Sequence, residues 1–160
     1  MKNELLKLLS RNARYSAAQL ADMLGTDEQT VTDSIKALEK EGVIYGYKAV
    51  IDWDSVENPS ISAIIEIKVV PKADLGFEEV AEKISSFDEV ESVYLMSGGY
   101  DLNVVVRAKT LKDVAQFVAR ELATIDSVTS TATHFVMRRY KELDVKLFEG
   151  EKDDRGNILI

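Results

Sequence analysis

A short turn in the second half of the chain carries residues whose types and spacing could bind a small ligand. Gly98 and Gly99 separate two strand-like segments, and Tyr100 and Asp101 follow them. Glycine lets the backbone approach a ligand closely, and exposed backbone N–H groups there can hold a carboxylate. The Asp101 carboxylate can accept hydrogen bonds from an ammonium group. Together these groups make a clamp for a molecule that carries both charges, as an amino acid does.

The same residues also suit a plain hairpin, because two strands joined by a tight turn often need glycine and Asp101 can cap the turn locally. Both interpretations stay open from the residues alone. If a ligand binds, we expect its opposite wall on the last helix-strand turn and strand, where Thr at alternate positions places hydroxyl groups on one face. A Thr-rich edge strand would show the same pattern. The candidate ligand-binding residues are Leu95, Gly98, Gly99, Tyr100, Asp101, Thr124, Thr131 and Thr133.

A helical segment at about residues 28–41 carries side chains suited to reading DNA. Gln can bond adenine through two hydrogen bonds, and Thr can touch a thymine methyl group or a phosphate. Asp33 can only repel phosphate or accept a hydrogen bond from cytosine N4. The expected contacts to double-stranded DNA are Arg14, Gln29, Thr30, Thr32, Asp33, Lys36 and Lys40.

Charge alone does not favour nucleic acid. Residues 1–48 contain seven basic and seven acidic residues, and the whole chain carries a formal charge of −8. Contacts from Lys and Arg to phosphate supply most non-specific affinity for DNA, while Lys36 and Lys40 could equally form a solvated face paired with Glu39 and Glu41. We therefore expect each site to bind weakly, and long DNA to bind better through several linked copies.

The composition excludes several kinds of chemistry. With no Cys and a single His, His134, the chain cannot build a disulfide framework, a thiolate zinc site or a site with two imidazoles. Gly98-Gly99 is not followed by the Lys-Ser/Thr pair of a phosphate-binding loop, and no catalytic triad is evident. We expect no catalytic residue, no metal and no cofactor. Without an apolar run of roughly 18 residues or a signal-peptide core, we expect a cytoplasmic protein with no membrane partner.

Three short helices are predicted to hold the DNA-reading side chains. Ser16 with Gln19 forms a capping box that opens the second helix, and Gly25 suits the left-handed residue that ends it. Apolar residues recur at helical spacing throughout. The side chains expected to face this core are Leu5, Leu6, Leu8, Leu9, Leu20, Met23, Leu24, Val31, Ile35 and Leu38.

The third helix is predicted to start at Thr26 or Asp27 and to end at Gly42. Only a few residues around a glycine separate it from the second helix, which is the spacing of a helix-turn-helix. Plain interaction bundles share this pattern, so the helices alone leave DNA binding open. Residues 43–47 follow as an extended segment.

The second half predicts the order β-α-β-β-α-β. This order gives an antiparallel sheet with two helices on one face, and the apolar groups on its other face need a partner, which favours dimers. Val104 to Val106 should be buried. We expect strands at residues 62–70, 90–97, 100–108 and 128–140, one helix opening at Asp74 or Gly76, and another opening at the Thr110–Asp113 capping box.

Read together, these pieces resemble the Lrp/AsnC family of "feast/famine" transcriptional regulators. Residues 16–25 followed by Thr30-Val31 match its helix-turn-helix frame. Residues 38–47, LEKEGVIYGY, look like its exit from the recognition helix, and residues 97–101, SGGYD, are similar to its hairpin motif. The family usually has Arg just before Ile35 and near residue 37, where this chain has Ser and Ala.

The resemblance implies an α+β chain with an N-terminal winged helix-turn-helix and a C-terminal ferredoxin-like βαββαβ (RAM) domain. It implies a DNA-binding regulator that assembles as dimers and further, often into octamers, and whose assembly or DNA affinity responds to a small effector, usually an amino acid. The alternative is an amino-acid-sensing oligomer whose DNA binding is weak or lost. The domains expected are 1–48 for DNA binding, 49–60 for a strand-forming linker around Pro59, 61–141 for effector binding and oligomerisation, and 142–160 for a C-terminal tail.

Overall fold

The computed structural model describes residues 1–70 and 76–147. It divides the chain into two compact units, which we call the head and the sheet domain. The head contains Met1–Ile51 together with Lys141–Lys146, and the described part of the sheet domain is mainly Asp52–Tyr140. The last residues of the predicted tail, 148–160, lie outside the described residues.

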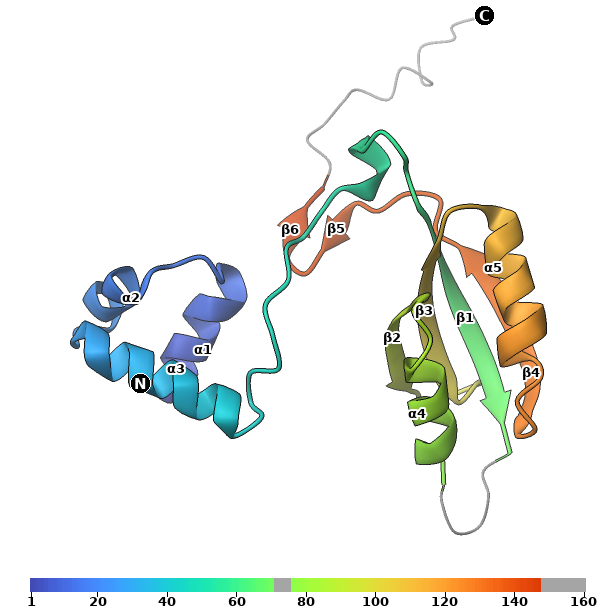
Figure 1. Cartoon of the computed structure of the whole chain (residues 1–160), viewed down its shortest axis with the longest axis horizontal. Helices are drawn as coiled ribbons and strands as arrows, with labels where there is room; N and C mark the ends of the chain where they lie inside the picture. The colour runs from blue at the N-terminus through green and yellow to red at the C-terminus, as the bar shows by residue number, and fades with distance from the viewer. Residues whose placement is uncertain (71–75, 148–160) are drawn as a thin grey trace, which may run out of the picture. The chain divides into compact units, whose positions relative to one another are not determined.

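Three helices form the head, as predicted: α1 (Lys2–Arg11), α2 (Ala17–Leu24) and α3 (Glu28–Lys40), all visible in Figure 1. Both hydrogen bonds of the Ser16–Gln19 capping box are present, and Gly25 ends α2 with a φ of 65°. Asp27, not Thr26, caps α3. Both ends of α2 and the start of α3 are therefore fixed by local hydrogen bonds.

The core of the head differs from the prediction at one position. Met23 was expected inside, but its side chain is 52% exposed. On a helical wheel it lies about 100° from the buried stripe of α2, and the small Ala21 is buried instead. The buried residues of the head are Leu5, Leu20, Ala21, Val31 and Leu38, with Leu6, Leu8, Leu9, Leu24 and Ile35 partly buried against them.

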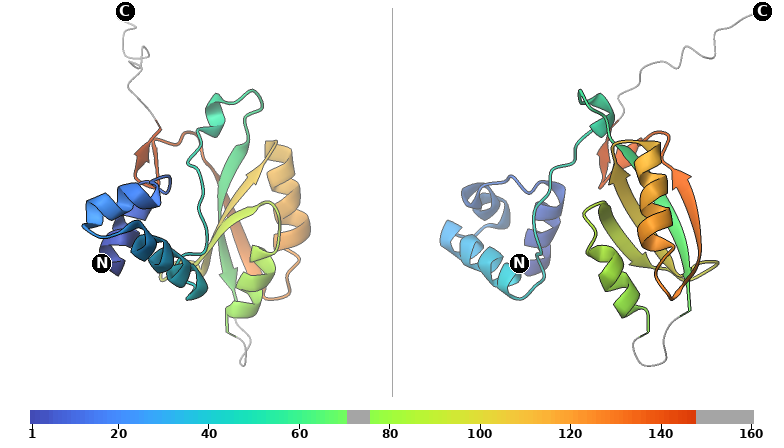
Figure 2. Two further views of the ribbon diagram at one scale, coloured as in Figure 1. Left: turned by 60° about the vertical axis from the view of Figure 1, so that its left-hand side comes forward. Right: turned by 45° about the vertical axis from the view of Figure 1, so that its right-hand side comes forward.

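The sheet domain has the predicted βαββαβ order. Its four strands pair in the order β2-β3-β1-β4, with antiparallel neighbours throughout. Figures 1 and 2 show α4 and α5 lying over one face of this sheet. The elements are β1 (Ile61–Val69), α4 (Glu78–Ser85), β2 (Val90–Leu95), β3 (Leu102–Ala108), α5 (Leu111–Phe117), the π-helical turn η2 (Val118–Leu122) and β4 (Val128–Phe135).

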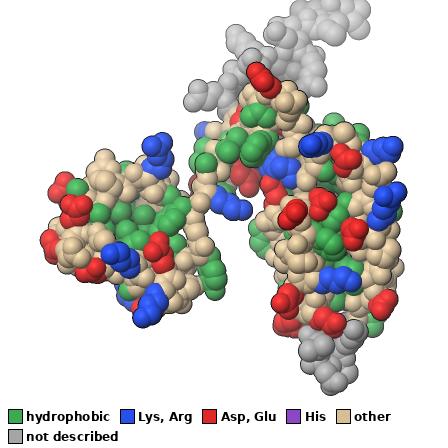
Figure 3. Space-filling model, in the orientation of Figure 1, with side chains coloured by type: hydrophobic (Ala, Val, Ile, Leu, Met, Phe, Trp, Pro, Cys, Tyr) green, Lys and Arg blue, Asp and Glu red, His purple; other side chains and the backbone are tan. Residues whose placement is uncertain are grey.

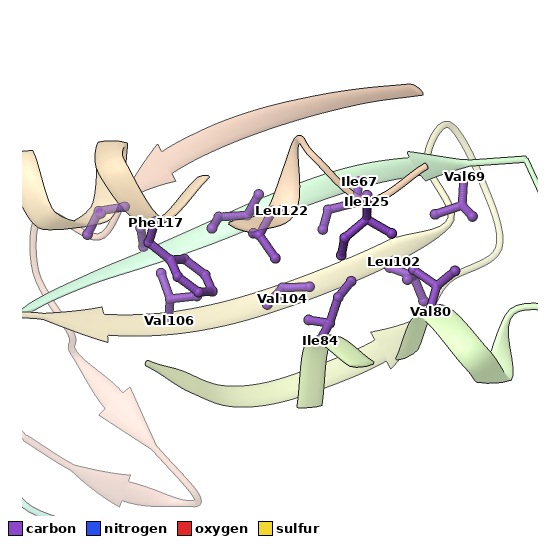
Figure 4. Close-up of a cluster of buried hydrophobic side chains, with 13 residues drawn as sticks. Ile67, Val69, Val80, Ile84, Leu102, Val104, Val106, Phe117, Leu122 and Ile125 are labelled. Carbon is purple, nitrogen blue, oxygen red and sulfur yellow. The ribbon is translucent and has the colours of Figure 1, made fainter. Parts of the chain in front are cut away.

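The core of the sheet domain lies between the sheet and these helices (Figure 4). Ile65 and Val104, which pair across β1 and β3, are fully buried, and Ile84 of α4 packs on the same cluster. Val105 was expected to be buried as well. Because side chains alternate along a strand, it points to the opposite face and is only half-buried.

Several element ends differ from the predicted ones. The helix α4 begins at Glu78 with Phe77 as its N-cap, whereas Gly76 lies before the helix and Asp74 lies outside the described residues. The strands flanking the turn are shorter, since β2 stops at Leu95 and β3 starts at Leu102. The last strand stops at Phe135, opposite Ala63 of β1, instead of at residue 140, and one more backbone bond, from Val136 N–H to the Ser62 carbonyl oxygen at 2.9 Å, follows its end.

A small hairpin, β5 (Lys141–Glu142) and β6 (Val145–Lys146), begins at the last residue of the predicted 61–141 domain and continues into the predicted tail. Its two turn residues, Leu143 and Asp144, have φ values of 43° and 65°, which is the backbone of a type I′ turn. The usual Asn-Gly signal is absent, so the sequence pattern did not reveal it. The Lys141 ammonium pairs with the Asp144 carboxylate at 2.8 Å and thereby lowers the pKa of Asp144.

The segment that enters β1 is fastened to the sheet by one arginine. Arg107 of β3 forms an ion pair with Glu91 of β2 and donates to the Ser60 hydroxyl at 2.9 Å. Its guanidinium carbon also lies 5.0 Å from the ring centroid of Trp53, which belongs to the 3-10 helix η1 (Trp53–Ser55).

In residues 1–70 and 76–147, no helix is long and apolar enough to cross a bilayer.

Candidate functional site

The outward face of α3 carries four of the residues expected to contact DNA. Gln29, Asp33, Lys36 and Lys40 recur at intervals of four, three and four, so that they fall within about 60° of arc on the helix. We call them the α3 stripe. All four are exposed, and the buried Val31 and Leu38 lie on the other side of the helix. The head therefore presents the stripe to solvent while the opposite side of α3 packs in its core.

Two members of the α3 stripe are bound to each other. The Gln29 Nε2 amide donates to both carboxylate oxygens of Asp33, at 3.0 and 3.1 Å. Thr32, on the edge of the same surface, donates its hydroxyl to the Glu28 carbonyl oxygen at 2.9 Å. These contacts fix how the stripe presents its polar atoms.

Thr30 has a structural role at the start of α3. Its backbone N–H donates to Asp27 Oδ1 at 2.9 Å, and its hydroxyl donates to Asp27 Oδ2 at 2.6 Å. These two bonds, the hydroxyl bond first, lower the pKa of Asp27. Thr30 is half-buried, so its hydroxyl serves the helix cap instead of lying on the stripe.

The carboxylates that could have neutralised the lysines of the stripe pair elsewhere. Glu39 accepts a hydrogen bond from the Tyr47 hydroxyl at 3.1 Å, and Glu41 forms an ion pair with Lys2 at 3.1 Å. Partial burial, together with Glu39, raises the pKa of Tyr47. Within the described parts of the chain, neither lysine of the stripe has an ion-pair partner. The structure thus does not show the alternative in which Lys36 and Lys40 pair with Glu39 and Glu41 on a solvated face.

Arg14 lies apart from the α3 stripe, in the loop between α1 and α2, where it is exposed. Its backbone N–H donates to Asn12 Oδ1 at 2.9 Å, which shapes the turn. In the view of Figure 3, the head shows both acidic and basic side chains, and several of the acidic ones lie along its left edge. This face therefore presents no continuous basic patch.

The second expected site lies at the turn between β2 and β3. Gly98 has a φ of 140°, a conformation that side chains resist, and both glycines are exposed. Met96 N–H donates to the Asp101 carbonyl oxygen at 2.8 Å and closes the turn. Asp101 Oδ2 accepts from the Val69 backbone N–H at 2.8 Å. The turn is thus fastened to the end of β1, a partner that sequence reasoning missed because it lies 32 residues away.

The other expected ligand residues fall into two groups. Thr131 of β4 and Leu102 of β3 both pair with Ile67 of β1, so that Thr131 lies about 10 Å across the sheet from the strand that follows the turn. Thr133 pairs with Ile65 and shares the helix-covered face. Thr124 instead donates its hydroxyl to carbonyl oxygens at the end of η2.

Two residues beside the turn complete the expected set. Tyr100 is half-buried, and its hydroxyl accepts a hydrogen bond from Asn103 at 3.2 Å. Leu95 is 62% exposed although its partner Leu102 is buried. The single chain therefore gathers Leu95, Gly98, Gly99, Tyr100 and Asp101 at one end of the sheet and leaves them open.

Across the described residues, no group of acidic and His side chains could hold a metal ion.

Two family models match the chain. The "Lrp/AsnC ligand binding domain" covers residues 62–145, and a "Winged helix-turn-helix DNA-binding" domain covers residues 2–45. The two matches together thus extend over both the head and the sheet domain. In the single chain, the described residues 43–52 that follow α3 form no strand.

The chain is similar to curated regulators along almost its whole length. It is 48% identical to YugG, an uncharacterized HTH-type transcriptional regulator of Bacillus subtilis, over 99% of this chain and 95% of that protein. It is 32% identical to the HTH-type transcriptional regulator LrpA of Pyrococcus abyssi, over 86% and 94%. These relatives are named as regulators and not as enzymes, in agreement with the prediction that the chain is not an enzyme.

A solved structure shares the fold. The transcriptional regulator NMB0573 of Neisseria meningitidis, solved in complex with L-Met, superimposes with a TM-score of 0.70 at 21% identity, covering 88% of this chain and 90% of that one. The head, the sheet domain and the order of their elements thus agree with known regulators. The chain belongs to the Lrp/AsnC family of DNA-binding transcriptional regulators, which join a helix-turn-helix to an effector-binding domain.

Proposed function

We propose that this regulator contacts double-stranded DNA through the α3 stripe and senses an amino acid at the turn of residues 96–101. The stripe is supported by its exposure and by the two lysines that no described carboxylate neutralises. Lys36 and Lys40 serve phosphates, whereas Gln29 and the adjacent Thr32 are placed for base edges. Arg14 is a further phosphate contact at the edge of the head.

The amino acid is proposed because the turn offers both halves of the required clamp. Open backbone N–H groups beside Gly98 and Gly99 suit the carboxylate, and the remaining lone pairs of the Asp101 carboxylate suit the ammonium group. The Neisseria meningitidis regulator was solved with L-Met, which supports the same ligand class here. Leu95 and Tyr100 would contact the side chain, with Thr124, Thr131 and Thr133 on the opposite wall.

The opposite wall requires a second copy of the chain. Thr131 lies across the sheet from the open turn, so one subunit cannot bring both walls onto a molecule the size of an amino acid. We propose homodimers that assemble further, as far as an octamer, with the effector held between subunits. Several heads on one assembly then bind a long operator through avidity. A regulator meets its operator where the genome lies, so we place it in the cytoplasm.

The observation that carries the effector site is the Asp101 carboxylate, and a matched pair of variants tests it. Asp101→Ala removes the acceptor of the Val69 N–H and should destabilise the sheet domain by about 1–3 kcal/mol. Asp101→Asn keeps an oxygen acceptor for that N–H but removes the charge. In a thermal-shift screen of the twenty amino acids, the wild type should gain stability with at least one, and Asp101→Asn should fold normally without that gain. A retained gain in Asp101→Asn would place the ammonium elsewhere.

The α3 stripe is tested by charge reversal with a control in the other unit. Lys36→Glu together with Gln29→Ala should abolish DNA binding and leave the oligomer size unchanged, because both side chains are exposed. Lys112→Glu, an equal charge change on the exposed surface of α5, should leave binding close to that of the wild type. Unchanged binding by the double variant would show that α3 is not the recognition helix.

Avidity is tested with DNA length and salt. The neutral head predicts weak binding of a one-site fragment, lost with modest salt, and much tighter binding of a multi-site fragment. Equal affinities for the two fragments would contradict avidity. If neither fragment binds at low salt, the protein is an amino-acid-sensing oligomer whose DNA binding is lost, an alternative motivated by the absence of Arg at Ser34 and Ala37.

A further inference from the structure

We infer that Asp33 holds the Gln29 side chain so that α3 selects a base carrying an exocyclic amino group, adenine or cytosine, over guanine or thymine. This inference rests on the proposed role of the α3 stripe and goes beyond it by naming the chemistry of one recognised base. Gln29 is the reading residue, and Asp33 is its positioning residue.

The amide of Gln29 is oriented by a partner that can only accept. The Gln29 Nε2 group lies 3.0 and 3.1 Å from the two oxygens of Asp33, one turn further along α3. A carboxylate has no proton to donate at neutral pH. If the amide were rotated by half a turn, its Oε1 oxygen would face two carboxylate oxygens without a hydrogen between them. The –NH2 group must therefore face Asp33, and Oε1 is directed away from it.

This orientation decides which base edges the helix accepts. In the major groove adenine and cytosine present amino donors, whereas guanine and thymine present O6 and O4 acceptors at the equivalent places. The free Oε1 of Gln29 accepts from an amino group. A base that presents an acceptor there would face Oε1 without a hydrogen between the two oxygens, and would also lie close to the Asp33 carboxylate. Guanine and thymine are thus rejected by two unfavourable contacts and not merely by the loss of one favourable contact.

The neighbouring lysines do not supply the same discrimination. Lys36 and Lys40 have donors only and flexible stems, which suit phosphate oxygens. Thr32 lies at the edge of the stripe, and its hydroxyl donates to the Glu28 carbonyl oxygen. Within the stripe, the Gln29–Asp33 pair is the group with a fixed acceptor, and one base position should depend on both residues.

The test is selection of bound sequences from a random DNA pool by the full-length protein and by single variants. For the wild type, one position should favour A or C by about tenfold or more over G and T. Gln29→Ala should erase the preference at that position. Asp33→Ala should relax the same position to within about threefold, because the amide can then turn either way. Replacing the preferred base by an analogue without its amino group should cost the wild type part of the mismatch penalty, because one favourable contact is lost without a repulsive one being added, and should cost Asp33→Ala little.

A matched control and three contrary results make the test decisive. Lys36→Ala should weaken binding to all sequences and reduce its salt dependence, without changing the preference. A preference for G or T, or a wild-type preference that survives Asp33→Ala, overturns the inference. If Asp33→Ala and Gln29→Ala alter different positions, Asp33 reads a base itself and is not a positioning residue. Sequence-independent DNA binding overturns this inference alone, whereas no DNA binding at all overturns the proposed function with it.

Discussion

The head and the sheet domain are each stabilised by a hydrophobic core, and the two cores differ in size. Among the described residues, five buried side chains form the core of the head and thirteen form that of the sheet domain. A small core leaves a small margin of stability, so the head relies on local devices such as the Ser16 capping box and the Asp27 cap. The sheet domain has a long-range ladder of strands in addition. The difference indicates that the proposed DNA-reading surface belongs to the less stable unit.

The two units also differ in what their exposed surfaces offer. The head presents the polar α3 stripe, whereas the uncovered face of the sheet mixes half-buried Ile64 and Val105 with Glu66 and His134, whose Oε1 and Nε2 atoms lie 3.5 Å apart. A polar stripe suits a hydrated groove, and a mixed face that no helix covers suits a second copy. In the proposed assembly, the sheet domain, which is the more stable unit, holds the copies together. Each assembly then carries several of the less stable heads.

The largest loss of stability should come from truncating a buried side chain in the core of either unit. Leu38→Ala and Ile65→Ala each remove a fully buried side chain and should each cost about 2–5 kcal/mol. Calorimetry should show that Leu38→Ala lowers the melting of the head alone and Ile65→Ala that of the sheet domain alone. One shared transition, displaced equally by both variants, would show that the units do not unfold independently.

A smaller effect should follow from Arg107→Ala in the sheet domain. The variant loses the Glu91 ion pair, the Ser60 hydrogen bond and the contact with Trp53, and should cost about 1–3 kcal/mol. Trp53 is the only tryptophan of the chain, so its fluorescence reports release of the segment. An unchanged spectrum would mean that Trp53 does not depend on Arg107, and Arg138→Ala provides a control in the same unit.

The two capping boxes allow the same change to be made once in each unit. Ser16 caps α2 of the head and Thr110 caps α5 of the sheet domain, each with both reciprocal bonds. Ser16→Ala and Thr110→Ala should each cost about 0.5–2 kcal/mol. In the head this is a larger share of the total, so a thermal melt should shift further for Ser16→Ala. A larger shift for Thr110→Ala would reverse the order of stability proposed for the two units.

The smallest effect concerns pH and the head alone. The bonds from Thr30 hold the pKa of Asp27 below 3.8 in the folded head. The resulting stabilisation is present above the unfolded pKa and is lost as pH falls through the lower folded value. Acid melts should therefore show the head weakening below about pH 4, and Asp27→Asn, which still caps but cannot titrate, should reduce this slope. An identical slope in Asp27→Asn would assign the acid sensitivity to other carboxylates.

Local signals in the sequence predicted much of this molecule. Both capping boxes, the left-handed Gly25 and the buried Val31 and Leu38 follow from hydrogen bonds and periodicities that span only a few residues. Predictions failed where a partner distant in sequence decided the outcome. The strand β4 ends at Phe135, opposite Ala63 of β1, and Met23 is exposed because its side of α2 has no neighbouring helix to bury it.

For the two candidate functional regions, the sequence by itself determined which side chains are available, and the tertiary structure decided what each one is free to do. It assigned Glu39 to Tyr47 and Glu41 to Lys2, which leaves the lysines of the stripe without those partners. It also fastened Asp101 to the backbone of Val69. Residue types set the possible hydrogen bonds, but each donor or acceptor serves only a few partners at once, and only the folded chain determines which partners come within reach.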